Sequence, residues 1–146
     1  MKTLILMRHG KADPYAESDF SRPLLPTGRE RVLRSAQALL SQQTKPELFF
    51  ASPLLRAQQT AEIVARVLQV PFQTQDLLDG RLSAKGLLEF IQTHLQEKDS
   101  LLLVGHNPNM SILASLLCKE YVSFEPGQYM CFDMTDFSNP KFLAGA

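Results

Sequence analysis

The sequence has no excess of charge of either sign. Its 15 Lys and Arg residues are balanced by 15 Asp and Glu residues, and no run of basic residues interrupts that balance. Proteins that bind nucleic acids or acidic membranes generally carry a basic surplus or a basic patch. We therefore expect neither a nucleic acid nor a membrane as a partner.

Cysteine is scarce, and long apolar runs are missing. The two cysteines, Cys118 and Cys131, match neither a CxxC metal site nor a disulfide framework. The apolar segment 3–7 is too short for a signal peptide, and segments such as 101–104 are far below the roughly 20 residues of a membrane span. We expect a soluble protein in a reducing cytoplasm.

The composition provides enough hydrophobic residues to form a buried core. Hydrophobic residues make up 45% of the sequence and charged residues 21%. A domain of roughly 150 residues buries about 70% of the surface of its unfolded chain. With no internal repeat or linker, residues 1–146 are expected to form a single domain. No apolar heptad or exposed apolar stripe suggests an obligate assembly, so a monomer is expected.

Short apolar segments alternate with amphipathic ones along the chain. Thr3–Met7 is a continuous apolar run, typical of a strand that is buried on both faces of a parallel sheet. The alternation predicts a three-layer α/β/α domain with a mostly parallel central sheet. Strands are expected at 3–7, 47–51, 72–75, 100–104 and 128–134, the last as an edge strand, and helices after Thr27, after Ser52-Pro53, over 84–97 and after Asn107-Pro108.

Three local signals suggest where helices begin. The segment Thr27-Gly-Arg-Glu30 matches a capping box. Ser52 and Pro53 form a favourable N-cap and N1 pair, and Asn107 is expected to cap the helix after Pro108.

Positively charged and titratable residues follow three of the predicted strands. Arg8 and His9 follow the first strand, Arg56 begins the helix after the second, and His106 follows the strand 100–104. Ligands of open α/β sheets bind at the carboxyl ends of the strands, so these four residues are expected to converge on one rim. The third histidine, His94, lies within the predicted helix 84–97 and is given no role.

Two kinds of chemistry could use this set. A two-histidine metal centre with Asp13 or Asp79 as third ligand is one, but a cation beside Arg8 would be repelled. Guanidinium groups and helix N-termini instead favour a tetrahedral oxyanion such as phosphate. A neutral imidazole can attack phosphorus and become phosphohistidine. Neither a GxxxxGK[ST] loop nor a Cys-x5-Arg loop is present, which argues against a nucleoside triphosphatase and a thiol phosphatase.

The same residues resemble the motifs of a known family. Leu6-Met7-Arg8-His9-Gly10 is similar to the RHG signature of the histidine phosphatase superfamily, which includes the cofactor-dependent phosphoglycerate mutases. Segment 52–60, SPLLRAQQT, resembles its second motif, S-x-x-x-R-x-x-x-T, and 105–108, GHNP, resembles the third. The resemblance implies that His9 is the phosphorylated nucleophile, and that Arg8, Arg56 and His106 hold the phosphoryl oxygens. It implies no metal and no cofactor.

Within the superfamily the chain resembles the short branch of SixA-like phosphohistidine phosphatases. Asp19-Phe-Ser-Arg22-Pro23-Leu24 is similar to a D-x-x-R-P-L segment of that branch, which makes Arg22 a candidate contact to phosphate or substrate. Mutases and many small-molecule phosphatases insert a cap between the second and third motifs. Here that interval is short, so we expect a phosphoglycerate mutase-like core without a cap and an open site.

The general acid is the least defined part of the predicted site. Mutase-like members place a Glu where this sequence has Leu77-Leu78-Asp79, one methylene shorter. Asp79 is therefore a candidate acid. A weak acid would hamper hydrolysis of alkyl phosphates, whose leaving group must be protonated. It would matter less for phosphohistidine, because imidazole can take its proton from water.

We therefore expect a metal-independent phosphatase that works through phospho-His9. The favoured substrate is phosphohistidine on a signalling protein such as a phosphotransfer domain, with phosphate as product, and this assignment rests on the resemblance. One alternative is a phosphatase of small phosphomonoesters such as sugar or nucleotide phosphates. An alternative of another class is a non-catalytic module that binds phosphoproteins.

Overall fold

In the computed structural model, which describes residues 1–146, the first strand lies in the interior of the sheet. This strand, β1 (Thr3–Arg8), pairs in parallel with β4 (Ser100–Gly105) and antiparallel with β5 (Tyr129–Asp133). Its residues 4–7 are fully buried. Leu4 and Leu6 pack into one hydrophobic cluster and Ile5 and Met7 into another, because successive side chains of a strand point to opposite faces.

Six strands form one sheet in the order β3-β2-β4-β1-β5-β6. β2 (Leu48–Ala51) pairs in parallel with both β4 and the two-residue β3 (Gln73–Thr74). β5 runs antiparallel to β1 and to β6 (Lys141–Gly145). The central part of the sheet is therefore parallel, as predicted.

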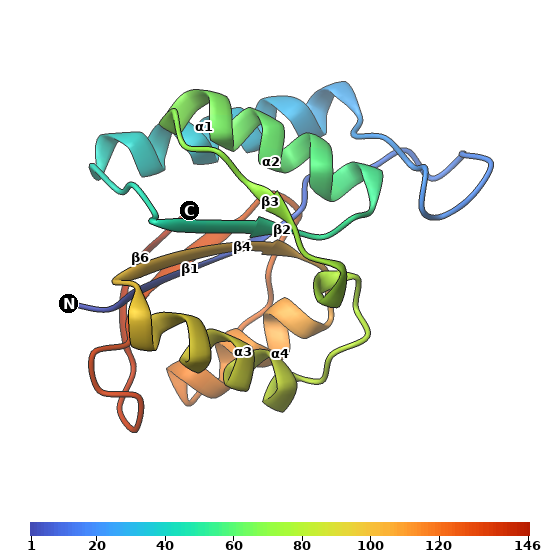
Figure 1. Cartoon of the computed structure of the whole chain (residues 1–146). Helices are drawn as coiled ribbons and strands as arrows, with labels where there is room; N and C mark the ends of the chain where they lie inside the picture. The colour runs from blue at the N-terminus through green and yellow to red at the C-terminus, as the bar shows by residue number, and fades with distance from the viewer.

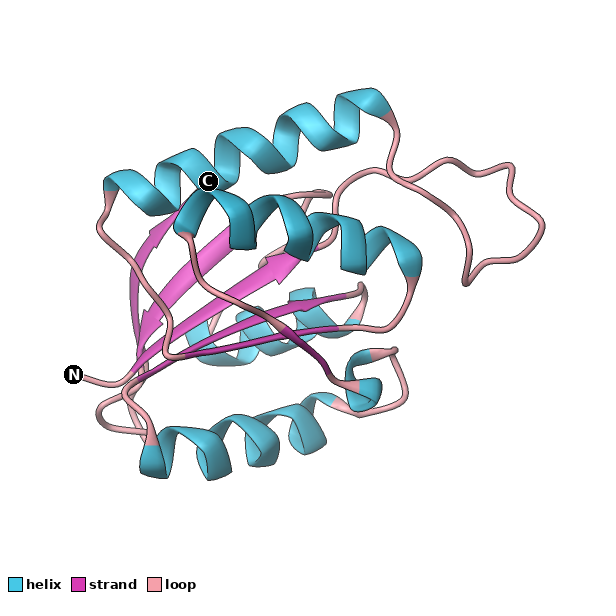
Figure 2. Cartoon of the chain, turned by 45° about the horizontal axis from the view of Figure 1, so that its top comes forward, coloured by secondary structure: helices cyan, strands magenta, loops and turns pink.

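Helices cover both faces of this sheet. The helices α1 (Pro26–Ser41) and α2 (Leu55–Leu68) lie on one face, and α3 (Ala84–Glu97) and α4 (Asn109–Cys118) on the other (Figure 1). Figure 2 shows the strands between the two helical layers. The predicted three-layer α/β/α architecture is thus confirmed. No helix of the chain has both the length and the apolar character to cross a bilayer.

No helical cap stands between the second and third motifs. That interval contains only the rest of α2, β3, a short 3-10 helix η1 (Asp76–Leu78), α3 and β4. The expectation of a core without a cap is confirmed.

The start of α1 differs from the prediction. The helix begins at Pro26 with Leu25 as N-cap, and no side chain caps it, so the capping box at Thr27 does not form. The cause is a close approach of backbone: Leu25 N–H donates to Lys11 O at 2.9 Å, and a Cβ on Gly28 would lie 2.2 Å from that same oxygen. This contact fixes the N-cap two residues earlier than the capping box predicts, at Leu25 instead of Thr27.

The start of α2 also differs from the prediction. Ser52 is not an N-cap, because its N–H donates to Val104 O at 3.1 Å and so extends the sheet by one residue. The helix begins only at Leu55, with Leu54 as N-cap and no side-chain cap. The side chain of Ser52 is thereby free for another contact at the rim.

Asn107 lies one residue before the N-cap of α4, which is Pro108. Its Oδ1 nevertheless accepts hydrogen bonds from Ser111 N–H (3.2 Å) and from the Ser111 hydroxyl (2.9 Å). The predicted capping contact therefore exists, from a shifted position.

The edge of the sheet was predicted wrongly. The strand expected at 128–134 is β5, an inner strand, and the edge is formed by β6, which the sequence analysis did not predict. Four of the five residues of β6 are exposed. Its apolar run, residues 142–144, is only three residues long, shorter than the four to eight residues by which a strand is recognised in a sequence.

Candidate active site

The parallel pairing of β1 and β4 places two histidines beside one another. Arg8 lies opposite Gly105 in the register, so the next residues on both strands, His9 and His106, leave the sheet together. Their ring centroids are 4.9 Å apart. Both side chains are buried, with 9% of His9 and 7% of His106 exposed. The predicted convergence at the carboxyl ends of the strands therefore occurs.

The ring of His9 is held in one orientation. Its Nδ1 lies 2.7 Å from Gly10 O. A carbonyl oxygen can only accept, so Nδ1 carries the proton and Nε2 carries the free lone pair. The Nε atom of Arg56 donates to that Nε2 at 3.4 Å. The nitrogen that is able to attack an electrophile thus faces the guanidinium group.

Arg56 lies at the start of α2 and is itself buried, with 7% exposed. Its Nη1 donates to Asp19 O at 2.7 Å, and its Nη2 lies 3.3 Å from a carboxylate oxygen of Asp19. The loop that carries Asp19 projects from the rim (Figures 1 and 2) and is tied back there by a hydrogen bond from Leu55 N–H to Phe20 O. The guanidinium group is therefore fixed between the histidine and this loop.

His106 is oriented by Ser52. The Ser52 hydroxyl lies 2.6 Å from His106 Nε2 and already accepts from Leu54 N–H at 3.2 Å, so its own proton is free to be donated to the ring. In the tautomer that accepts this proton at Nε2, the ring proton of His106 lies on Nδ1, which is buried and has no protein partner.

Arg8 completes the rim from β1. Its Nη1 donates to Phe124 O at 2.8 Å, while its Nε is buried without a partner. Burial lowers the pKa of this guanidinium from its ordinary value, but arginine stays charged in proteins. In the tautomer described above, two buried N–H donors, Arg8 Nε and His106 Nδ1, are unpaired, and an oxyanion could pair with them.

Both histidines are uncharged near neutral pH. Burial, opposed by the hydrogen bond to the Gly10 carbonyl and assisted by the neighbouring His106, Arg56 and Arg8, lowers the pKa of His9 to about 3. Burial, followed by the charge of Arg56, lowers the pKa of His106 to about 4. The rim therefore combines neutral imidazoles with permanent positive charge, the combination that nucleophilic attack on a phosphoryl group needs.

Arg22 lies on the same loop as Asp19, beside this rim. Its Nε donates to Asp13 O at 2.8 Å, and its Nη1 lies 3.1 Å from the other carboxylate oxygen of Asp19. The carboxylate of Asp19 thus links Arg22 to Arg56. Whether Arg22 contacts phosphate stays a prediction.

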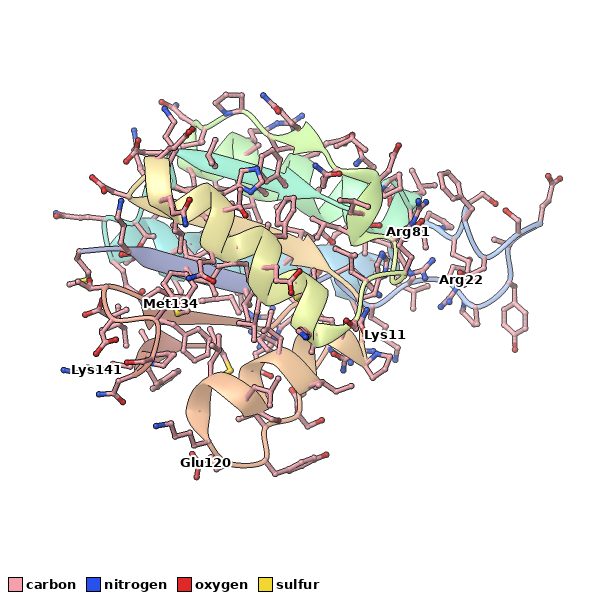
Figure 3. All side chains as sticks on the ribbon, turned by 60° about the horizontal axis from the view of Figure 1, so that its bottom comes forward. Lys11, Arg22, Arg81, Glu120, Met134 and Lys141 are labelled. Atoms are coloured by element: carbon pink, nitrogen blue, oxygen red, sulfur yellow. The ribbon has the colours of Figure 1, made fainter.

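Asp79 lies near the rim but is paired. Its carboxylate lies 2.7 Å from the Arg81 guanidinium, and this partner lowers its pKa below the ordinary value. Figure 3 shows Arg81 at the same end of the molecule as Arg22. A general acid needs a raised pKa, so the geometry weighs against this role, which remains a prediction.

Several residues that support the site were not predicted to do so from the sequence. Thr60, fully buried, accepts from Gly10 N–H at 3.0 Å and donates to Arg56 O at 2.8 Å, so it joins the first motif to the second. Its signal was the final T of S-x-x-x-R-x-x-x-T. Ser52 was interpreted as a helix cap, and Asp19 only as part of a motif. For the metal alternative, no group of three His, Cys, Asp or Glu side chains forms a potential metal site in the chain.

Comparison with known proteins gives consistent matches. The sequence profile described as histidine phosphatase superfamily (branch 1) matches residues 4–82, just over half of the chain. The phosphohistidine phosphatase SixA of Escherichia coli (strain K12) is 32% identical over 120 residues, which cover 79% of this chain and 73% of that protein. An uncharacterized protein of Picosynechococcus sp. is 39% identical over 113 residues, 73% of this chain and 67% of that one. A structure of the protein histidine phosphatase SixA complexed with tungstate superposes with a TM-score of 0.89 at 26% identity, covering 98% of this chain and 95% of that one.

Proposed function

The chain belongs to the histidine phosphatase superfamily and is a SixA-like phosphatase of that superfamily, and from this premise we propose that it removes phosphate from phosphohistidine on a signalling protein. The observation that carries the proposal is the orientation of His9. Its Nδ1 is bonded to Gly10 O at 2.7 Å, so its Nε2 is an unprotonated nucleophile beside the Arg56 guanidinium.

The first step transfers the phosphoryl group to the enzyme. The lone pair of His9 Nε2 attacks phosphorus while the P–N bond of the substrate breaks, and the bonding electrons leave with the substrate imidazole. In phosphoryl transfer, catalysis is mainly positioning and stabilisation of the equatorial oxygens. Arg8, Arg56 and His106 supply that stabilisation, through the two unpaired N–H donors and the Arg56 guanidinium.

The second step releases phosphate. A water molecule attacks the phosphorus of phospho-His9, the new P–N bond breaks, and inorganic phosphate leaves with neutral His9 restored. The positive groups of the rim stabilise the same oxygens in both steps. This reaction requires neither a metal ion nor a cofactor.

The pairing of Asp79 supports phosphohistidine over an alkyl phosphate as substrate. An alkoxide leaving group needs a proton from the enzyme, and the Arg81 partner holds the Asp79 carboxyl in its ionised form. Imidazole takes its proton from bulk water on its other ring nitrogen and leaves neutral. The SixA structure is complexed with tungstate, a tetrahedral oxyanion, and that relative's binding of such an ion supports a phosphoryl group as the ligand here.

The open rim supports a protein rather than a free small molecule. No cap lies between α2 and β4 to enclose a sugar or nucleotide phosphate. A module that only binds phosphoproteins would need the guanidinium groups but not an unprotonated Nε2 at their centre. Both alternatives therefore lack an observation that favours them.

We further propose that residues 1–146 form a single domain that acts as a monomer in the cytoplasm. One sheet connects segments from Thr3 to Gly145, and both cysteines are free thiols, in keeping with a reducing compartment. Sedimentation at micromolar concentration tests the oligomeric state.

Incubation with a phosphotransfer domain phosphorylated on histidine tests the function. We expect the wild type to release phosphate, also in the presence of EDTA, and the His9→Ala variant to release none above background. Release that is unaffected by His9→Ala would refute the mechanism. Activity on sugar or nucleotide phosphates with none on any phosphohistidine protein would refute the substrate.

A further inference from the structure

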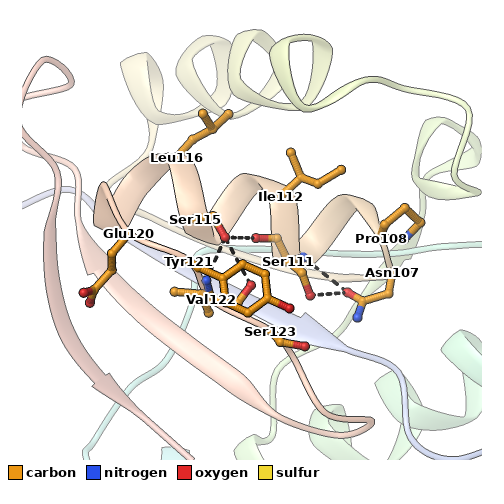
Figure 4. Close-up of a pocket in the computed structure, with 10 residues that line it drawn as sticks. All are labelled: Asn107, Pro108, Ser111, Ile112, Ser115, Leu116, Glu120, Tyr121, Val122 and Ser123. Carbon is orange, nitrogen blue, oxygen red and sulfur yellow. Dashed lines mark hydrogen bonds between the residues drawn. The ribbon is translucent and has the colours of Figure 1, made fainter.

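A groove of about 730 Å³ lies along α4 (Figure 4), and neither His9 nor His106 is among the residues that line it. Its first wall is the helix, with Ile112 and Leu116, and its second is the returning segment 120–123, with Tyr121 and Val122. We call it the α4 groove. None of the four residues that form the catalytic rim (Arg8, His9, Arg56 and His106) lines it.

The walls of the α4 groove expose large apolar side chains. Ile112 is 47% exposed, Leu116 54% and Tyr121 87%. The buried core of this helix layer uses other residues of α4, so nothing else in the chain covers these three. Contiguous exposed apolar surface on a soluble protein often marks an interaction site.

The two serine hydroxyls that α4 contributes to the groove are already hydrogen-bonded within the chain. The Ser115 hydroxyl is bonded to Ser111 O (2.8 Å), to Val122 O (3.1 Å) and to Val122 N–H (2.9 Å), and the Ser111 hydroxyl donates to Asn107 Oδ1 (2.9 Å) (Figure 4). These groups offer few hydrogen bonds to a ligand. The face of α4 in the groove therefore offers an occupant mainly apolar contact, through Ile112 and Leu116.

Both walls of the groove lead to the catalytic rim. On one side, Asn107 and Pro108 directly follow His106. On the other, Ser123 precedes Phe124, whose carbonyl oxygen accepts both from Arg8 Nη1 (2.8 Å) and from Asn107 Nδ2 (3.2 Å). The groove is therefore a continuation of the rim along the side of the molecule.

We propose that the α4 groove docks the phosphorylated protein whose phosphohistidine enters the rim, an inference that rests on the proposed function. The ten residues of α4 span roughly 15 Å. A standard protein interface covers about 800 Å² on each partner, a disc of roughly 16 Å radius. A protein that presents a side chain at the rim thus reaches the groove, whereas a small phosphate compound does not.

The charges define the chemistry of this partner. The rim is positive through Arg8 and Arg56, whereas the only charged residue that lines the groove is Glu120. The matching surface carries an anionic phosphohistidine with an uncharged apolar patch beside it. An amphipathic helix with the phosphohistidine near one end of its apolar stripe has this form.

Two substrates with the same P–N bond test the proposal. One is a phosphotransfer domain phosphorylated on histidine, and the other is the free amino acid phosphohistidine. The variants are Leu116→Glu and Tyr121→Ala, the second in an exposed segment where its effect on folding is small. We expect kcat/KM for the phosphorylated domain to fall at least about tenfold, the loss of one interface hot spot, and kcat/KM for free phosphohistidine to change less than about twofold.

Leu40→Glu is the matched control, because Leu40 is 46% exposed and lies on α1 at the opposite face of the sheet. It should leave both values unchanged. Equal kcat/KM of the wild type and both groove variants on the phosphorylated domain would overturn the groove proposal alone. So would a wild-type dimer that Leu116→Glu dissociates, since the groove would then be occupied by a second copy.

Failure of the proposed function gives a different result. A wild type that hydrolyses free phosphohistidine but no phosphorylated domain would overturn the protein substrate and the groove together. A wild type that hydrolyses neither would overturn the phosphohistidine assignment itself.

Discussion

The two rim imidazoles make the folded protein sensitive to mild acid. Burial lowers the pKa of His9 to about 3 and that of His106 to about 4, whereas an unfolded histidine titrates near 6.5. Between these values the unfolded chain binds more protons than the folded one. The free energy of unfolding therefore falls as the pH drops from about 6.5 toward the folded pKa values, and it is unaffected above that window.

The size of the effect at a given pH follows from how far that pH lies below the pKa of histidine in the unfolded chain. At pH 5 the solution lies about 1.5 units below the unfolded pKa, and each unit corresponds to about 1.36 kcal/mol. Each imidazole thus lowers the free energy of unfolding by about 2 kcal/mol and the pair by about 4 kcal/mol. That is a large part of the roughly 5–15 kcal/mol typical of a domain. Carboxyl groups with a lowered pKa, such as Asp19 and Asp99, contribute only below about pH 4.

Urea unfolding at pH 7 and pH 5, followed by circular dichroism, measures this difference. We expect a drop of about 4 kcal/mol for the wild type, about 2 kcal/mol for His9→Gln or His106→Gln, and almost none for the double variant. Ser35→Ala is the control, because it removes a buried hydrogen bond to Gly127 O (2.6 Å) without removing a titrating group. It should lower stability by about 1 kcal/mol at both pH values.

A wild type equally stable at pH 5 and pH 7 would refute this reasoning. The same holds if the double variant shows the full drop of the wild type, because the sensitivity would then arise elsewhere. In either case the pKa values of the two imidazoles in the folded protein would not lie below the unfolded value, as their burial implies.

Three substitutions test the parts of the site. Ser52→Ala removes the hydroxyl that orients His106 (2.6 Å), and kcat for phosphohistidine should fall about tenfold with little change in KM; an unchanged kcat would contradict the positioning role. Asp79→Asn should leave kcat/KM unchanged for both an alkyl phosphate and phosphohistidine, because the Arg81 partner already holds the carboxyl ionised; a loss confined to the alkyl phosphate would mean that the carboxyl protonates its leaving group. Asp19→Asn removes the carboxylate charge that lies 3.3 Å from Arg56 Nη2, while the hydrogen bond from Arg56 Nη1 to the backbone oxygen of residue 19 (2.7 Å) remains. Inhibition by inorganic phosphate should therefore strengthen about two- to fivefold, and weaker inhibition would indicate that the carboxylate is needed to hold the guanidinium.

The sheet and the rim could be predicted because both depend on strong local patterns. The runs 3–7 and 100–104 are buried on both faces, and the residues directly after them meet because parallel strands end at one edge. His9 and His106 follow from this rule with no knowledge of distances.

Helix starts were less predictable because tertiary contacts decided them. The capping box at Thr27 was displaced by the contact of Lys11 with Gly28, and the cap at Ser52 by one more hydrogen bond of the sheet. Strand β6 is mostly exposed, and its short apolar run does not distinguish it from a loop in the sequence.

The connections between motifs were also hidden from the sequence. The pairing of Asp79 with Arg81 and the bridge that Asp19 forms between two arginines depend on how loops fold. The α4 groove arises where the chain turns back after Cys118, which periodicity alone does not locate.

The transfer of the phosphoryl group to His9 is tested most directly by trapping the intermediate. A phosphotransfer domain carrying radioactive phosphate on its histidine is mixed with the enzyme, the reaction is quenched in base within milliseconds, and the enzyme is digested and mapped. We predict that the label appears transiently on the peptide containing His9, attached at Nε2, and that the His9→Ala variant acquires none. A burst of labelled phosphate with no label on His9 at any time, or label on another residue, would contradict the account.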